Sequence, residues 1–77
     1  MNAQDIEQMI EQGLPGAEVT VLGEDGSHFE ATVVFDGFVG KPPLACHRMV
    51  YATLGDHVES GALHALALKT LTPDQAA

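Results

Sequence analysis

Two short runs of alternating apolar and polar residues, joined by a glycine-rich link, constrain the fold of this chain more than any other feature. Residues 17–22 (AEVTVL) and 28–35 (HFEATVVF) are rich in β-branched side chains, which favour strands. The link contains Asp25 and Gly26, a pair typical of hairpin turns. The sequence therefore predicts an antiparallel hairpin with one face packed on helices. The residues of that face are Val19 and Val21 on the first strand and Phe29, Ala31, Val33 and Phe35 on the second.

Residues 2–13 carry the spacing of an amphipathic helix. Its apolar stripe is formed by Ile6, Met9, Ile10 and Leu14. Asn2 is expected to cap the helix, with Asp5 placed three residues later as in a capping box. Gly13, interpreted as the residue just past the helix, and Pro15 are expected to end it.

The second half of the chain predicts another helix and a third strand. Pro42 and Pro43 stand just ahead of a helix at residues 44–54. The side of this helix that we expect to face the core carries Leu44, His47, Val50, Tyr51 and Leu54. Residues 55–61 allow at most a short helical turn, and residues 62–69 are interpreted as a strand that covers the hairpin. The order indicates an α+β domain of three strands with helices on one face.

Length and composition point to one soluble domain. A chain of 77 residues has room for a single domain, which we expect to span residues 1–77 with an ordered core at about 3–72. No apolar run approaches the ~20 residues of a membrane span, and residues 1–8 do not resemble a secretory signal. One cysteine excludes an internal disulfide. We therefore expect a cytoplasmic protein without a membrane partner.

Charge narrows the classes of partner. Eleven acidic residues face three basic ones, for a net charge of -8, and no basic residue precedes position 41. Nucleic-acid binders usually present a basic face, so this balance disfavours that class. The less acidic second half is the expected location of the functional surface.

Catalytic patterns are missing from the sequence. Cys46 and His47 are adjacent, but neighbouring helix positions point ~100° apart and do not form a nucleophile–base pair. A single interior cysteine is more often a small buried apolar residue. The glycines of GFVG at 37–40 fit the GxxG pattern of KH domains, although a turn before the helix explains them better. We expect a binding module and not an enzyme.

The histidines are the most informative polar residues. They stand at 28, 47, 57 and 64, and imidazole is a common metal ligand. His28 and His64 begin two predicted strands and would lie at one end of the sheet if the strands are neighbours. Two histidines make half of a tetrahedral site, which a second protein could complete; otherwise they are ordinary polar residues at strand ends. His57 is interpreted as solvent-facing.

The sequence contains five short motifs that occur in the same order in a known protein family. They lie within GEDGSHFEATVVF, FVGKPPLACHRMVYATL and LHALALKTLTPDQ. The chain resembles the BolA family of small stress-morphogen proteins from about residue 4 to residue 75. The resemblance implies an α-β-β-α-(α)-β fold with a three-stranded mixed sheet, related to type II KH domains.

The same resemblance implies a partner and a cofactor. Family members pair with a monothiol glutaredoxin of the CGFS type and share a bridging [2Fe–2S] cluster with it and its glutathione, in iron–sulfur trafficking or iron regulation. Leu63-His64-Ala65-Leu66 matches the hAL motif of the family, and the resemblance implies that its histidine, His64, ligates the cluster. A hairpin-loop residue often adds a ligand. Here His28 is the most available second ligand, although it can instead be a structural strand residue, and Asp25 and Cys46 stay open as alternatives. No cluster is expected in the isolated chain.

The chain also departs from the family pattern. Cys46 replaces a common arginine before His47, and Ala76 replaces a common tryptophan. Lys41, Cys46, His47 and Arg48 are the residues that we expect to border the partner-binding surface. Because some relatives are described as transcriptional regulators, DNA binding through Lys41, His47 and Arg48 is the alternative, and a weak homodimer is left open.

Overall fold

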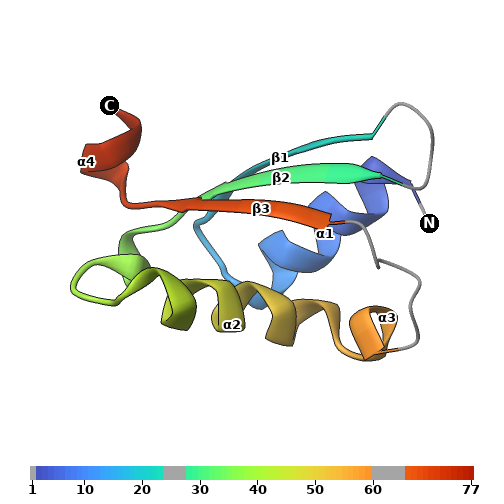
Figure 1. The fold of residues 1–77 in the computed structure, drawn as a ribbon. Coiled ribbons are helices and arrows are strands. Elements are labelled where there is room, and N and C mark those ends of the chain that lie inside the picture. The colour runs from blue at the N-terminus through green and yellow to red at the C-terminus, as the bar shows by residue number, and fades with distance from the viewer. Residues whose placement is uncertain (1, 24–27, 60–65) are drawn as a thin grey trace.

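A three-stranded sheet is the centre of the structure, a computed structural model that describes residues 2–23, 28–59 and 66–77. Its strands are β1 (Glu18–Leu22), β2 (Phe29–Val34) and β3 (Leu66–Leu71), in the order β1-β2-β3. β1 and β2 are antiparallel, whereas β2 and β3 are parallel, so the sheet is mixed as expected (Figure 1). The predicted third strand is confirmed over residues 66–69 and continues to Leu71; residues 62–65 lie outside the described residues.

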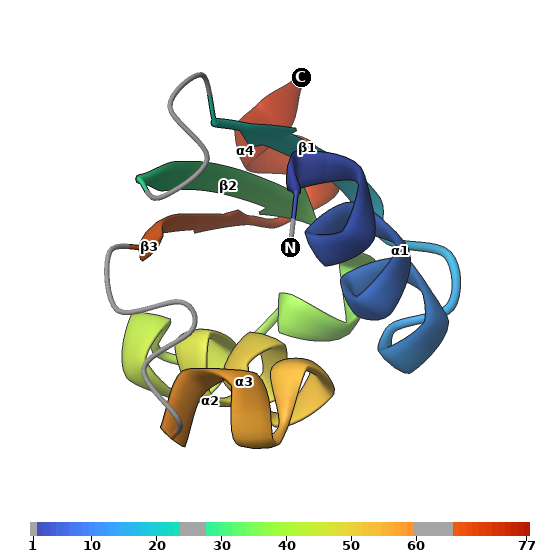
Figure 2. The ribbon, with the colours of Figure 1, turned by 90° about the vertical axis from the view of Figure 1, so that its right-hand side faces the viewer.

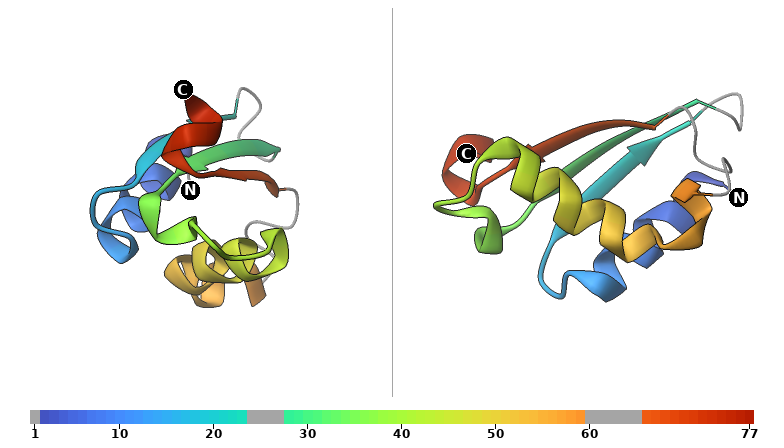
Figure 3. Two further views of the ribbon diagram at one scale, coloured as in Figure 1. Left: turned by 90° about the vertical axis from the view of Figure 1, so that its left-hand side faces the viewer. Right: turned by 60° about the horizontal axis from the view of Figure 1, so that its bottom comes forward.

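The two long helices pack on one face of this sheet. These are α1 (Ala3–Gly13) and α2 (Pro43–Leu54), which lie side by side beneath the strands (Figures 1 and 3). The expected short turn after α2 is α3 (Asp56–Glu59). Beyond the expected ordered core, residues Pro73–Ala76 form a last helical turn, α4, at one end of the sheet.

Strand register explains which residues reach the core. Val21 pairs with Ala31, and Ala31 pairs with Leu68, so these three side chains share the face that meets the helices. The buried positions of β2 alternate with more exposed ones, as the period of a strand requires. The opposite face is open to solvent and carries exposed Glu30 and Lys69.

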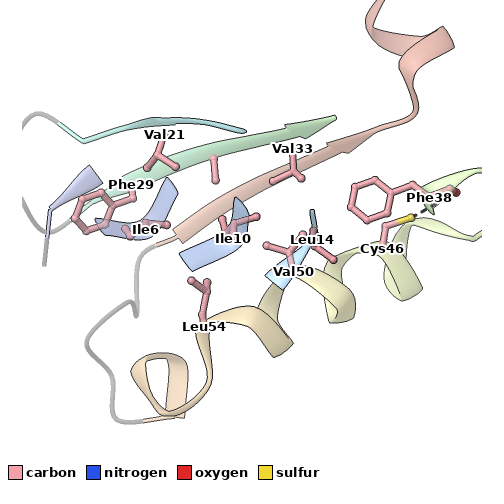
Figure 4. Packing of buried hydrophobic residues seen from close by; sticks show 11 residues of the cluster. Ile6, Ile10, Leu14, Val21, Phe29, Val33, Phe38, Cys46, Val50 and Leu54 are labelled. Atoms are coloured by element: carbon pink, nitrogen blue, oxygen red, sulfur yellow. Dashed lines mark hydrogen bonds between the residues drawn. The ribbon is translucent and has the colours of Figure 1, made fainter. Parts of the chain in front are cut away.

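The core lies between the sheet and the two long helices (Figure 4). It is formed by Ile6, Ile10, Leu14, Val21, Phe29, Ala31, Val33, Phe38, Cys46, Val50 and Leu54. The expected core face of α2 is partly wrong: Leu44 is 62% exposed, while Cys46 is 5% exposed. His47 and Tyr51 are half-buried. The inward face of α2 is therefore rotated toward Cys46, Val50 and Leu54.

Both ends of α1 follow from the sequence, but Gly13 has a different role from the expected one. The Asp5 N–H donates to Asn2 Oδ1 at 2.8 Å and the Asn2 N–H donates to Asp5 Oδ2 at 3.0 Å, which confirms the capping box. Gly13 is the last residue of the helix, and the cap is Leu14. A Cβ at Gly13 would lie 2.7 Å from Thr53 Cβ, so glycine allows α1 to approach α2 closely.

Candidate functional site

The parallel strands β2 and β3 begin at the same end of the sheet. Phe29, the first residue of β2, is the register partner of Leu66, the first residue of β3. His28 directly precedes Phe29 and is exposed. His64 precedes Leu66 by two positions in the sequence, and both His64 and Asp25 lie outside the described residues. The structure thus confirms that the two strands are neighbours and places His28 at their common starting end.

The helical turn α3 lies at this same end of the molecule (Figures 1 and 2). Its His57 is exposed, which confirms the solvent-facing interpretation. Within residues 2–23, 28–59 and 66–77, no three His, Cys, Asp or Glu side chains are grouped so that they could hold a metal ion. This end of the sheet therefore carries two exposed imidazoles among the described residues, His28 just before β2 and His57 on α3.

The other candidate residues belong to the loop before α2 and to its first turns. A short 3-10 helix, η1 (Asp36–Phe38), follows β2, and Phe38 anchors it in the core with 2% exposure. The Phe35 and Phe38 rings meet edge to face at 5.4 Å. The Lys41 N–H donates to the Phe38 carbonyl at 3.1 Å, and Gly40 takes a φ of 80. The GFVG segment is thus a turn, as the simpler interpretation expected, and it presents exposed Lys41.

Cys46 is held inside this turn. Its Sγ lies 3.9 Å from the Lys41 carbonyl oxygen and 4.0 Å from that of Phe38, and its N–H donates to the Pro42 carbonyl at 3.2 Å. The side chain is 5% exposed and belongs to the core cluster. A thiol in this position packs the loop against α2, and it is not presented to solvent.

His47 and Arg48 lie on the flank of α2 that faces away from α1. Gly13 of α1 meets Thr53, which fixes the flank of α2 that faces α1. Because successive helix residues turn by ~100°, His47 and Tyr51 fall on the opposite flank, and Arg48 points farther outward. His47 is half-buried and Arg48 is exposed.

Two apolar residues of this region did not figure among the expected site residues. Val39 is 65% exposed and Leu44 is 62% exposed, and they stand on either side of Lys41 and the two prolines. Exposed apolar side chains mark a docking surface when they form one contiguous patch, whereas single ones are ordinary on a protein surface. The sequence held a signal for Val39, an apolar residue between glycines, but Leu44 was assigned to the core face.

The two groups of candidate residues occupy opposite ends of the sheet (Figure 1). β2 runs from His28 at one end to the loop with Lys41 at the other, and its 6 residues span about 20 Å. Cys46 and His28 are therefore separated by the length of the strand. The structure places Lys41, His47 and Arg48 around the start of α2, away from His28. Cys46 was expected to border the same surface, but it is buried beneath them because its side chain packs in the core.

A hollow of ≈ 370 Å³ lies between α4 and the open face of the sheet. Its polar side chains are Glu18 and Asp36, and its other lining residues are glycine, valine, proline and alanine. Both polar side chains of this hollow are carboxylates. In the part of the chain that the structure describes, no helix is long and apolar enough to cross a membrane.

Known protein families and solved structures include proteins with a similar sequence and the same fold. The family described as "BolA-like protein" matches residues 9–75. The structure of a bolA protein homologue from Coxiella burnetii superposes with a TM-score of 0.85, at 47% identity, over 99% of this chain and 96% of that chain. The BolA domain of SufE1 from Arabidopsis thaliana superposes with a TM-score of 0.71, at 32% identity, over 94% and 92% of the two chains.

Two curated bacterial proteins are similar in sequence. The acid stress protein IbaG of Escherichia coli is 32% identical over 73 residues, which cover 95% of this chain and 86% of IbaG. The DNA-binding transcriptional regulator BolA of the same species is 48% identical over 46 residues, which cover 60% of this chain and 43% of that protein.

Proposed function

This chain belongs to the BolA-like family, and on that basis we propose that it is an adaptor and not an enzyme. In this proposal it forms a heterocomplex with a monothiol CGFS glutaredoxin and contributes ligands to a shared [2Fe–2S] cluster. His64 is the proposed first ligand, and His28 is the proposed second. The family membership supports the choice of partner. The positions of the two histidines in the sequence support their assignment as ligands.

One observation carries the proposal for the ligands. Phe29 and Leu66 are register partners, and the two histidines precede these residues by one and two positions in the sequence. A parallel pair with this register begins both strands at one end of the sheet, and His28 is exposed there. In the proposal, the crossover that returns the chain to the start of β2 brings donors that are far apart in the sequence to one site.

The donor chemistry of the described end fits such a group. Neutral imidazole is an established ligand of [2Fe–2S] clusters, and replacing thiolates with imidazoles raises the reduction potential of the cluster. His28 would hold a ligand position without displacing any core side chain, since it precedes the strand and is exposed. Two imidazoles supply half of the ligands that two tetrahedral irons require from proteins, and the glutaredoxin with its glutathione supplies thiolates for the rest.

The test compares alanine variants of three histidines. The proposal places all three near the same end of the sheet but gives them different roles. His64→Ala is expected to change the visible circular dichroism of the complex formed with a cluster-loaded CGFS glutaredoxin, and His28→Ala is expected to change it to a smaller extent. His57→Ala, exposed on α3 at the same end, is the matched control and should leave the spectrum unaltered. Far-ultraviolet circular dichroism checks that each variant is folded. An unaltered visible spectrum for folded His64→Ala removes this residue from the cluster.

DNA binding is the second candidate function, because one relative is described as a DNA-binding transcriptional regulator. Exposed Lys41 and Arg48 lie near the start of α2, where a helix N-terminus also favours phosphate. The net charge of -8 opposes this function. Retention of the protein on duplex DNA that falls steeply with added salt would support it, and no retention at ~50 mM salt would exclude it.

A further inference from the structure

The two edges of the sheet are treated differently by the rest of the chain. β1 is the edge strand on the side of α1 (Figure 2). There the Val21 N–H, which points away from β2, donates to Glu7 Oε1 of α1 at 3.1 Å. The Glu7 carboxylate thus binds the outward N–H of Val21, which an added strand would otherwise use for pairing.

The other edge is formed by β3. The Phe35 N–H donates to the Leu71 carbonyl at 3.0 Å, which shows that the backbone of Leu71 is turned toward β2. Because the direction alternates along a strand, the backbone groups of Leu66, Leu68 and Thr70 are turned toward the outer edge. No described side chain bonds to them there, in contrast to the Glu7 contact on β1. Each of the three residues therefore offers an N–H and a carbonyl to an added strand.

A half-covered apolar strip runs beside this edge. Leu66 and Leu68 point toward the helices but are only half-buried, and Tyr51 on the adjacent flank of α2 is half-buried as well. At the centre of the sheet the equivalent positions Phe29 and Ala31 are each 2% exposed. Apolar side chains of an added strand would complete the cover that Leu66 and Leu68 lack.

Charge indicates the chemistry of the added strand. The chain has three basic residues against eleven acidic ones, and one of the three, Lys69, lies on β3 itself. Lys69 is exposed on the open face, next to the side chains that an added strand would place there. A carboxylate opposite a lysine stabilises a strand pair. A second copy of this chain is a poorer occupant, since it brings its own Lys69 to the edge and places like charges across the strand pair.

We propose that the outer edge of β3 binds an extended segment of another polypeptide as a fourth strand. The segment alternates apolar residues, which face Leu66, Leu68 and Tyr51, with acidic residues, which face the side of Lys69. Backbone hydrogen bonds to Leu66, Leu68 and Thr70 provide affinity, and the alternation provides specificity. This inference rests on the edge of the sheet and is independent of cluster ligation by His28 or His64.

The experiment uses the whole chain and a labelled, end-capped peptide of alternating valine and glutamate. Binding is expected to slow amide hydrogen exchange at Leu66, Leu68 and Thr70, and to raise the fluorescence anisotropy of the peptide. Thr70→Pro removes an outward N–H without touching the bonds to β2, and it is expected to weaken binding about tenfold. Thr70→Val, which keeps the N–H, is the matched control. Lys69→Glu is expected to weaken binding several-fold, whereas Lys69→Arg should retain it.

Four results would overturn the proposal. They are unchanged exchange at the three amides in saturating peptide, equal binding by a valine–lysine peptide, equal loss of binding in Thr70→Pro and Thr70→Val, and preferential binding of a single-stranded oligonucleotide. Protection that rises with protein concentration without peptide would instead identify a second copy as the occupant. Each variant is checked by far-ultraviolet circular dichroism, so that an unfolded protein is not counted as a loss of binding.

Discussion

Replacing Gly13 with alanine sets two physical effects against each other at the contact between α1 and α2. Gly13 is the last residue of α1 and carries no positive φ. A Cβ there would lie 2.7 Å from Thr53 Cβ and still closer to Thr53 Cγ2. Real Cβ atoms do not approach other carbon atoms so closely, so one helix would have to move.

Helix propensity favours alanine over glycine by about 1 kcal/mol in a helix interior, and by less at a terminal residue. Overpacking a tight contact costs about 1–3 kcal/mol. The atom in the way is a Cβ held by the backbone of α2, and the Thr53 hydroxyl is also fixed by a 2.6 Å bond to the Val50 carbonyl, so rotation of the side chain gives little relief. We expect Gly13→Ala to destabilise the fold by about 1–2 kcal/mol. A chain of 77 residues is expected to have a free energy of unfolding of about 4–12 kcal/mol, so this loss is a substantial part of the total stability.

Urea denaturation of the wild type, Gly13→Ala, Thr53→Ala and the double variant measures this effect. The cost of Gly13→Ala should fall by about half in the Thr53→Ala background, because Cγ2 is gone while Cβ remains. Gln12→Ala, an exposed change one residue earlier, serves as the control for propensity alone. A stabilising Gly13→Ala, or a cost that is the same with and without Thr53, would refute the argument from close approach.

Four further substitutions test the cap, the buried cysteine and the core face of α2. Asn2→Ala removes the acceptor of the Asp5 N–H and should cost about 1 kcal/mol in urea denaturation. Cys46→Ala should cost about 1 kcal/mol in stability and leave the visible spectrum of the glutaredoxin complex unaltered, as expected for a packed thiol and not for a ligand. Val50→Ala, at 0% exposure, should cost about 2 kcal/mol, whereas Leu44→Ala, at 62% exposure, should cost less than about 0.5 kcal/mol; equal costs would contradict the orientation of α2.

The elements with one dominant pattern could be predicted from the sequence. The hairpin strands have a period of two with β-branched residues, and their inward faces are those expected. The start of α1 carries a complete capping box. The same type of signal was overlooked at the other end of the chain, where Thr72 and Gln75 form a second capping box that begins α4. The ordered core was expected to end at about residue 72, although the local chemistry favours a helical turn beyond it.

The orientation of α2 could not be predicted from periodicity, because apolar residues surround much of this helix. More than one apolar stripe can be drawn along this helix, and each includes a different one of Leu44, Cys46 and Tyr51. Tertiary contacts decide which stripe faces the core. Close packing of Thr53 on Gly13 sets the flank that meets α1, and this places Cys46 inward. The shared starting end of β2 and β3 was conditional on their being neighbours, which is a property of the sheet and not of either segment alone.

The separation of the candidate residues into two ends predicts that docking and ligation can be disturbed independently. Lys41 lies at the end of the sheet opposite His28, about 20 Å away along β2, and Arg48 is on the outer flank of α2. If these residues border the partner, Lys41→Glu and Arg48→Glu will weaken the complex with a CGFS glutaredoxin several-fold in calorimetric titration. The visible spectrum of the complex that still forms will stay that of the wild type, since a surface charge at this distance is screened at physiological salt. A changed spectrum with unchanged affinity would show that the partner contacts this end of the chain through the cluster environment, and that the two ends are not separate surfaces.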